Sequence, residues 1–303
     1  SRPIDEHING LIALGADIII EEGIVKAKTR GNKNRLHGTH IKLNCPSVGA
    51  TETLIMAASL AKGRTTRAKA ARVPEVQDLG EMLNKMGAKI YDSGKETIII
   101  HCVNKLPGCT HKVIPDRIEA GTFLIAGAIT NGDITVENIE PDHLIIVSKC
   151  LNYAGFKLDF KQNPIRIQSS GNSIQPVDIT TAIYPGFPTD LQAQWMALMT
   201  KAKGKSTITE EIYTDRFTHI AELSRFGAHI RLINNQAIIK GMEILKGAPV
   251  MSTDIRASAS LILAALSSEG TSSITRVYHI DRGYDKIEEK LTTLCARIKR
   301  VKD

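Results

Sequence analysis

The chain has 303 residues and a formal net charge of +7, from 39 basic and 32 acidic side chains. Hydrophobic residues make up 42% of it, so the chain is long and apolar enough for two domains with cores of their own. Aromatic residues make up only 4%, and no apolar run is long enough to cross a bilayer, which argues against nucleic acid and membranes as partners.

The cysteines, histidines and charges narrow the possible classes of protein further. Five cysteines without a CxxC pair and nine scattered histidines predict neither a disulfide framework nor a metal site. We therefore expect a reducing compartment, the cytoplasm, or a plastid stroma if the source is a plant or alga. The positive charges are spread along the chain, so a solvated basic surface is the first explanation for them and a pocket for an anionic small ligand the second.

Taken in chain order, the predicted elements repeat. An amphipathic helix that ends at a glycine and passes into a β-prone run recurs with steps of 72 or 68 residues, and the equivalent positions are Gly15, Gly87, Gly155, Gly227 and Cys295. Such spacing predicts one supersecondary unit copied several times. The glycines are predicted to cap the helices with positive φ.

Small-residue helices run in step with these phrases. They are predicted near 50–61, 121–130, 191–202 and 257–267, and their apolar or small residues on nearly every side are typical of core helices. Each unit then holds a buried helix, a strand, a more polar helix and a strand pair. The first unit lacks its buried helix, so we expect material upstream of Ser1 that has been removed or is carried on another chain.

The starts of these helices carry the candidate site. Residues 47–49, Ser-Val-Gly, resemble a helix start that binds phosphate through its backbone N–H groups. Thr189 to Gln192 and Asp116 to Glu119 fit capping boxes, which places Asp190 and Asp254 in or beside a first turn. Four arginines stand in short polar phrases: Arg2, Arg216, Arg256 and Arg282. Plain caps and surface ion pairs would explain each feature alone, but together they suggest a cleft for a polyanionic substrate.

Six phrases, in order along the whole chain, closely resemble the UDP-N-acetylglucosamine (UDP-GlcNAc) 1-carboxyvinyltransferase family. They are residues 2–5 (RPID), 46–52 (PSVGATE), 116–123 (DRIEAGTF), 187–194 (FPTDLQAQ), 254–260 (DIRASAS) and 278–284 (YHIDRGY). The family implies the enolpyruvyltransferase fold, a two-domain inside-out α/β barrel of βαβαββ units around buried helices. We expect residues 1–114 to form an incomplete first domain, with about two of its three units, and residues 115–303 to form the second.

The resemblance also implies a reaction. The enolpyruvyl group of phosphoenolpyruvate is transferred to the 3-hydroxyl of UDP-GlcNAc with release of phosphate, in the first committed step of peptidoglycan synthesis, without a cofactor. By motif match, the catalytic residues are Asp190, which is the base, and Arg282, which clamps phosphoenolpyruvate or its phosphate together with Arg256. Arg2 lies at the same anionic centre, and Arg216 belongs to the same site. The UDP part falls to the segments Arg2, Pro3, Ile4, Asp5, Glu6 and Cys45, Pro46, Ser47, Val48, Gly49, and the sugar to the backbone of Ile212.

The chain departs from the family at several points. The family's catalytic cysteine would fall just before Ser1, and its amino-terminal Lys-Asn pair is likewise not in the chain. Val73 stands in place of an acidic residue, and Thr214-Asp215 in place of Glu-Asn. We therefore expect negligible turnover by residues 1–303 alone. The alternatives are one half of a split enzyme that a complementing amino-terminal segment completes, a non-catalytic UDP-sugar-binding remnant, or the shikimate-pathway relative, which should lack the Arg-Pro-x-Asp phrase.

Overall fold

The computed structural model describes residues 4–30, 35–159 and 162–301. The chain divides into two compact units, residues 1–114 and residues 115–303, and each is described by itself. Their hydrophobic cores share no residue, since one runs from Leu14 to Ile100 and the other from Ile118 to Leu291. Among the described residues, no helix is both long and apolar enough to span a membrane.

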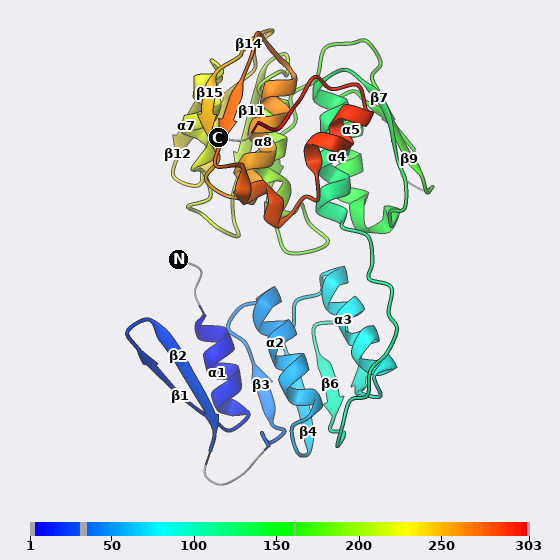
Figure 1. The fold of residues 1–303 in the computed structure, drawn as a ribbon, viewed down its shortest axis with the longest axis vertical. Coiled ribbons are helices and arrows are strands. Elements are labelled where there is room, and N and C mark those ends of the chain that lie inside the picture. The colour runs from blue at the N-terminus through cyan, green and yellow to red at the C-terminus, as the bar shows by residue number, and fades with distance from the viewer. Residues whose placement is uncertain (1–3, 31–34, 160–161, 302–303) are drawn as a thin grey trace. The chain divides into compact units, whose positions relative to one another are not determined.

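Unit 1 contains one complete repeat and part of another. The partial repeat consists of α1 (Asp5–Ala13) and the antiparallel hairpin of β1 (Ala16–Glu21) and β2 (Ile24–Thr29). The complete repeat runs through β3 (His40–Lys42), α2 (Val48–Ser59), β4 (Arg64–Ala68), α3 (Pro74–Lys85), β5 (Lys89–Tyr91) and β6 (Ile98–His101). Its strands form a sheet in the order β3-β4-β6-β5, in which only β3 and β4 are parallel. Figure 1 shows α1, α2 and α3 side by side, with α2 in the middle.

Unit 2 opens with a second repeat of this kind. Its elements are α4 (Arg117–Ile129), β7 (Asp133–Val136), the 3₁₀ helix η1 (Pro141–Leu144), α5 (Ile145–Tyr153), β8 (Lys157–Leu158) and β9 (Ile165–Gln168). The strands pair in the order β7-β9-β8, with both pairs antiparallel. This order matches the last three strands of the sheet in unit 1.

The next repeat reproduces the complete sheet. It comprises β10 (Ile179–Thr180), η2 (Thr189–Leu191), α6 (Gln192–Met199), β11 (Lys205–Thr209), α7 (His219–Arg225), β12 (His229–Ile233) and β13 (Gln236–Lys240). The strand order β10-β11-β13-β12, with the first pair parallel, is that of β3-β4-β6-β5. The repeated unit predicted from the spacing and the α/β architecture of βαβαββ units implied by the resemblance are therefore confirmed.

The last repeat is shorter. It contains β14 (Leu245–Lys246), β15 (Pro249–Met251), α8 (Ile255–Leu266), β16 (Ser268–Glu269), β17 (Ser273–Thr275), η3 (Val277–Arg282) and α9 (Ile287–Thr293). Its strands form two parallel pairs, β14 with β16 and β15 with β17. The three helices α4, α6 and α8 pack on one another at the centre of the unit, where all eight residues of α6 are buried (Figure 1).

The predicted glycine caps are confirmed by the backbone. Gly15, Gly87, Gly155 and Gly227 have φ between +89° and +101°, and each follows directly after a helix cap. Cys295, which stands at the fifth equivalent position, also has a positive φ of +67°. The repeat therefore preserves a left-handed residue at this turn even where the glycine has been replaced.

One expectation about the buried helices is wrong. The sequence predicts that α2 is a core helix on all sides, but Met56 and Leu60 are 49% and 40% exposed. In unit 2 each such helix has two others of its kind beside it, whereas the helices beside α2 in the described part of unit 1 are the more polar α1 and α3. Its third side therefore faces outward, while Leu54, Ile55 and Ala58 on its inner side are buried.

Candidate functional site

Three charged side chains predicted for the site lie together in unit 2. Asp190 is in η2, just before α6, Arg256 is in the first turn of α8, and Arg216 is in the loop that leads to α7. Asp190 Oδ1 accepts hydrogen bonds from Arg216 Nη2 at 3.0 Å and from Arg256 Nε at 3.2 Å. The Asp190 side chain remains 37% exposed, and each arginine 17%. One carboxylate thus joins two guanidinium groups at a partly open surface.

The electrostatics keep Asp190 ionised. Burial by itself raises the pKa of this carboxyl, but the positive charges of Arg256 and Arg216 outweigh it, and the net pKa is lowered. Burial works to lower the pKa of Arg256, and the Tyr284 oxygen and the Asp190 carboxylate reverse that effect, so its net pKa is raised. At neutral pH the cluster is therefore one anion between two cations, with a net positive charge.

A buried polar network supports this cluster from within the core. The Tyr284 hydroxyl lies 2.8 Å from Thr122 Oγ1 and accepts from Arg256 Nη1 and Gln194 Nε2, both at 3.3 Å. Gln194 Nε2 also donates to the carbonyl of Asp190 at 3.0 Å. Thr122, Gln194 and Tyr284 are each at most 2% exposed. The network fixes the starts of α6 and α8 relative to α4, and therefore the spacing between Asp190 and Arg256.

Glu210 organises the neighbouring loop. Its buried carboxylate accepts from the backbone N–H groups of Ile212 and Tyr213, both at 2.9 Å, and from the hydroxyl of Thr181 at 2.7 Å. It also accepts from Thr189 Oγ1 at 2.9 Å. Ile212, predicted to contact a sugar through its backbone, is thus held on the same carboxylate as the residue before Asp190.

These contacts correct the predicted capping box at Thr189. Thr189 makes no capping hydrogen bond, because its hydroxyl donates to Glu210 and accepts from Arg216 Nη1 at 3.2 Å. Of the box predicted from Asp116 to Glu119 the Asp116 cap is present, and Asp254 caps its helix as well. Asp116 accepts from the N–H groups of Ile118 and Glu119, and Asp254 from those of Arg256 and Ala257. Glu119 pairs with Lys290 of α9 at 2.6 Å.

Arg282 stands at the end of η3, two residues before Tyr284. It is exposed, and the part of the chain that the structure describes gives its guanidinium no hydrogen bond or ion pair. The adjacent Gly283 packs on the start of α8, since a Cβ on it would lie 2.7 Å from Ile255 and 3.8 Å from Arg256 Nη1. This contact brings the segment that carries Arg282 against the turn that carries Arg256.

The remaining predicted residues belong to unit 1. Ser47 is the N-cap of α2 and accepts from the N–H of Ala50, so Val48 and Gly49 form the first turn. Cys45 and Val48 are exposed, and Pro46, Ser47 and Gly49 are half-buried. Ile4 and Asp5 are exposed at the start of α1, where Glu6 is half-buried. Arg2 and Pro3 lie outside the described residues.

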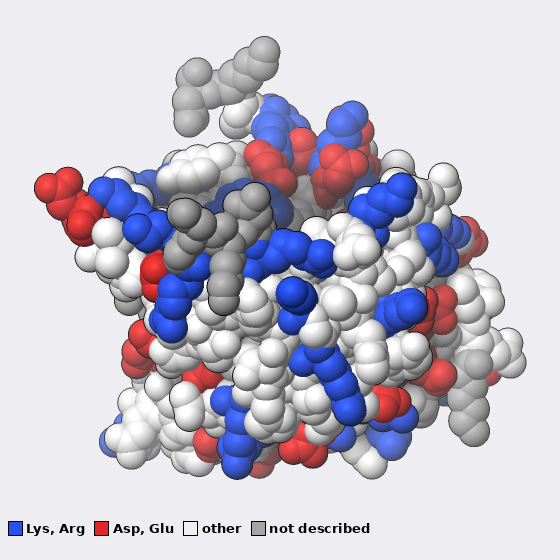
Figure 2. Space-filling model, turned by 90° about the horizontal axis from the view of Figure 1, so that it is seen from below, with Lys and Arg blue, Asp and Glu red and all other residues white. Residues whose placement is uncertain are grey.

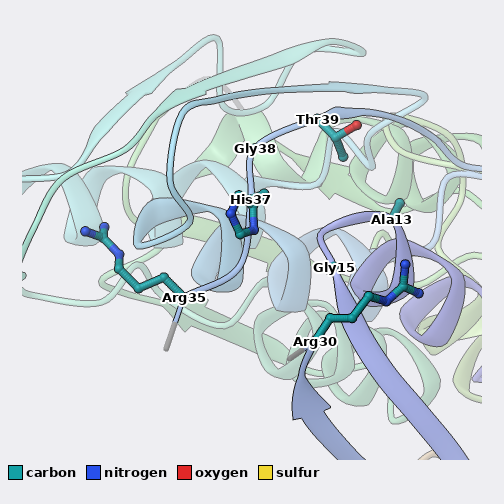
Figure 3. A pocket seen from close by; sticks show the side chains of 7 residues that line it. All are labelled: Ala13, Gly15, Arg30, Arg35, His37, Gly38 and Thr39. Atoms are coloured by element: carbon teal, nitrogen blue, oxygen red, sulfur yellow. The ribbon is translucent and has the colours of Figure 1, made fainter. Parts of the chain in front are cut away.

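A cavity of about 500 Å³ in unit 1 is a different feature. It is lined by Ala13, Gly15, Arg30, Arg35, His37, Gly38 and Thr39, none of which the sequence assigns to the site. Figure 3 shows Arg30 extending toward Ala13 and Arg35 pointing away from it. Arg30 pairs with Asp17, and Arg35 donates to the carbonyls of Leu60 and Val103. Both guanidinium groups are therefore occupied by contacts within unit 1.

The basic residues of the surface do not gather into one patch on the face seen in Figure 2. Lysine and arginine side chains are scattered there among neutral and acidic ones. This distribution agrees with the interpretation of the +7 charge as a solvated surface.

The sequence indicated the charged residues of the candidate site but not the buried polar residues that position them. Tyr284 and Gln194 lie within quoted motifs, but nothing in their local pattern indicates that they meet Thr122. Glu210 follows the β-prone run of residues 205–209 without any signal that it accepts four hydrogen bonds. The one signal in the sequence that could have indicated Glu210 is its position, two residues before the predicted sugar contact at Ile212.

The repeated βαβαββ units around buried helices place the chain in the class of enolpyruvyl transferases. In structure, the chain is similar to the enolpyruvyl transferase NikO from Streptomyces tendae, with a TM-score of 0.87 and 24% identity over 99% of this chain and 73% of that one. It is also similar to the EPSP synthase of Acinetobacter baumannii, with a TM-score of 0.72 and 21% identity over 100% and 72% of the two chains. At these identities the likeness shows the fold.

The sequence comparisons show the family. The profile of EPSP synthase (3-phosphoshikimate 1-carboxyvinyltransferase) matches residues 1–291. The UDP-N-acetylglucosamine 1-carboxyvinyltransferase of Prochlorococcus marinus strain MIT 9312 is 64% identical over 300 residues, which are 99% of this chain and 65% of the relative. That of Geobacter metallireducens is 50% identical over 303 residues, which cover 100% and 72%. The chain therefore belongs to the EPSP synthase family and, within it, to the UDP-N-acetylglucosamine 1-carboxyvinyltransferases. It spans about two thirds of the length of these relatives.

Proposed function

We propose that the protein transfers the enolpyruvyl group of phosphoenolpyruvate to the 3-hydroxyl of UDP-GlcNAc and releases phosphate, in the cytoplasm. The observation that carries the proposal is the Asp190 carboxylate held between Arg216 and Arg256, in a chain whose relatives bear the name of this enzyme at 50–64% identity. Such a cluster offers a proton acceptor and cations for two anionic groups within a few ångströms. The proposed chemistry requires no cofactor.

Asp190 is the proposed base for the sugar hydroxyl. Two bound arginines make its carboxylate a weak base, because they favour the charged form. A phosphate or carboxylate that arrives at Arg256 would share the positive charge of that guanidinium. The hold on Asp190 would then weaken and its basicity would rise as the second substrate binds. The cluster thus links proton acceptance to the presence of the anionic substrate.

The other assignments follow from exposure and pairing. Arg282 is exposed with no partner among the described residues, so its charge is available for the carboxylate or phosphate of phosphoenolpyruvate. The first turn of α2 after Ser47, together with Asp5 and Glu6, is proposed for the UDP part, because the N–H groups of a helix start and its dipole favour phosphate. The Ile212 backbone is proposed as a contact to the sugar.

The test compares Asp190→Ala with the unaltered protein as the cell makes it. Phosphate release from phosphoenolpyruvate and UDP-GlcNAc should fall by at least about 10²- to 10⁴-fold, the usual contribution of a positioned acid or base. Affinity for UDP-GlcNAc should stay within a few fold. Asp142→Ala, which removes an exposed carboxylate of η1, serves as the control and should leave both quantities unchanged. Full turnover by Asp190→Ala would refute the assignment of the base.

A further inference from the structure

The loop between β3 and α2 is held by three hydrogen bonds to one residue, Asn44. Its backbone N–H donates to Glu6 Oε2 at 3.1 Å, and its Nδ2 donates to Glu6 Oε1 at 2.7 Å. Its carbonyl accepts from Lys69 Nζ at 3.4 Å. Asn44 directly precedes Cys45, and the loop ends at Ser47, the cap of α2. Whatever holds Asn44 therefore sets the entry of the chain into the proposed UDP segment.

Beneath this loop, the core of unit 1 contains an arginine without a hydrogen-bond partner. Arg67 of β4 lies between Ile41 and Ile98 of the neighbouring strands and is fully buried. None of its three guanidinium nitrogens has a hydrogen-bond partner among the described residues. Burial lowers the pKa of Arg67 to about 10, and the charge of Glu6 opposes that effect, so the group stays protonated at neutral pH. Glu6 is thus the carboxylate that its charge attracts.

Lys69, which donates to the carbonyl of Asn44, has a left-handed backbone conformation. It adopts φ of +56°, a left-handed conformation that costs a residue with a side chain some free energy. This turn follows the end of β4, and the lysine amino group reaches back to the carbonyl of Asn44. The same left-handed conformation follows β7 at Asn138 and β17 at Arg276, so the contact with Asn44, rather than the backbone, distinguishes Lys69.

We propose that Glu6, Arg67 and Lys69 are positioning residues that hold the loop of residues 44–47 in the geometry that binds the UDP moiety. This inference rests on the proposed function. Glu6 fixes the N–H and the side-chain amide of Asn44, Lys69 fixes its carbonyl, and the buried charge of Arg67 keeps the Glu6 carboxylate in place. Arg67 and Lys69 need not touch the ligand themselves.

The charges favour the same ligand. The three groups carry two positive charges and one negative charge. They lie next to the start of the twelve-residue helix α2, where the helix dipole places its positive end. A diphosphate is doubly anionic, so their net field attracts it. Because Arg67 is buried, salt screens its contribution much less than that of a surface lysine.

The experiment measures the dissociation constant of UDP-GlcNAc and the urea midpoint for the unaltered chain, Arg67→Met, Arg67→Lys and Lys69→Met. Arg67→Met should weaken binding about five- to twentyfold while the midpoint stays the same or rises, because a buried guanidinium without a hydrogen-bond partner has been removed. Arg67→Lys should restore much of the affinity, and Lys69→Met should weaken binding about threefold. Lys89→Met, which removes an exposed charge on β5 of the same unit, is the control and should change neither quantity.

The outcomes separate the two proposals. If the unaltered chain does not bind UDP-GlcNAc, the proposed function fails and this inference fails with it. If the unaltered chain binds and Arg67→Met binds equally well, the inference alone is overturned. A loss of affinity in Arg67→Met that comes with an equal loss of stability, and that Arg67→Lys does not restore, would also overturn it, since Arg67 would then be a structural residue only.

Discussion

At the scale of single residues, Tyr284 connects the buried side chains that position the candidate site. Its hydroxyl is the one atom that Thr122, Gln194 and Arg256 all reach. We expect Tyr284→Phe to lower the free energy of unfolding by about 1–2 kcal/mol, because Arg256 Nη1 loses its acceptor, although Gln194 Nε2 keeps Thr122 Oγ1 and the Asp190 carbonyl. Urea unfolding measures the change. Tyr153→Phe, at a tyrosine that is 71% exposed, is the matched control and should stay within about 0.5 kcal/mol of the unaltered chain. Equal effects at the two positions would contradict the assigned network.

His219 provides a prediction about pH. Burial lowers the pKa of His219 to about 4 from its ordinary value of 6.5, and Arg216 adds to the effect while Asp254 opposes it. Between these two pH values the unfolded chain binds a proton that the folded chain does not. The stability due to neutral His219 is therefore fully present above about pH 6.5 and is lost as the pH falls toward 4.

The measurement compares the unaltered chain with His219→Phe, which keeps a ring in the same place. Between pH 7 and pH 5 the unaltered chain should lose about 2 kcal/mol more of its unfolding free energy than the variant does. Other groups titrate in both proteins and cancel in the difference. Parallel pH profiles would show that His219 is not held neutral in the folded state.

The sequence could identify the charged residues of the site but not the residues that position them. Asp190, Arg216 and Arg256 stand in short polar phrases at helix starts, where local patterns are informative. Thr122 and Tyr284 are 162 positions apart and Gln194 is 72 positions from Thr122, so their contacts arise from the packing of α4, α6, α8 and the segment after η3. Thr189 shows the same limit, because a distant carboxylate, Glu210, took the hydroxyl that its local pattern assigned to a cap.

At the scale of elements, the helix-ending glycines were predictable because they recur and because their role is local. Cys295 tests the reason directly, since it carries a side chain at a φ of +67°. We expect Cys295→Gly to stabilise the chain by up to about 1 kcal/mol, because glycine adopts this conformation without a Cβ clash. Thermal or urea unfolding measures the gain.

The reciprocal variant is Gly227→Cys. A Cβ at Gly227 would meet only Met242, at an ordinary 3.7 Å, so its cost should come from the φ of +89° and amount to about 1 kcal/mol of destabilisation. Opposite signs at the two positions are the expected result. A loss of stability in both variants would mean that Cys295 is held by contacts of its own rather than tolerated at a glycine position.

The exposed side of helix α2 could not be predicted from the sequence. Its composition is that of a core helix, and hydrophobic periodicity cannot tell how many neighbours a helix has. The structure surrounds α6 with α4 and α8 but leaves Met56 and Leu60 of α2 exposed. The number of core helices in each unit therefore decides how much of such a helix is buried, and that number is a property of the assembled unit.

At the scale of the whole molecule, one kind of unit is used repeatedly and its helix starts carry the candidate site residues. Unit 1 presents the capped start of α2 with the Asn44 loop, and unit 2 presents Asp190, Arg216 and Arg256. The repeat preserves the sheet order and the glycine caps, while the helix starts differ from one repeat to the next. This division explains why repeat spacing predicted a copied supersecondary unit, while the candidate site residues were proposed from the helix starts and from the family resemblance.

The most direct test of the central claim is to map UDP-GlcNAc on the 303-residue chain by amide NMR chemical shifts. We predict that the largest shifts fall on residues 45–49 and around Asp190 and Ile212, and that Asp142 in η1 does not move. Shifts confined to the cavity bordered by Arg30 and Arg35, or no shifts at millimolar UDP-GlcNAc, would contradict the account.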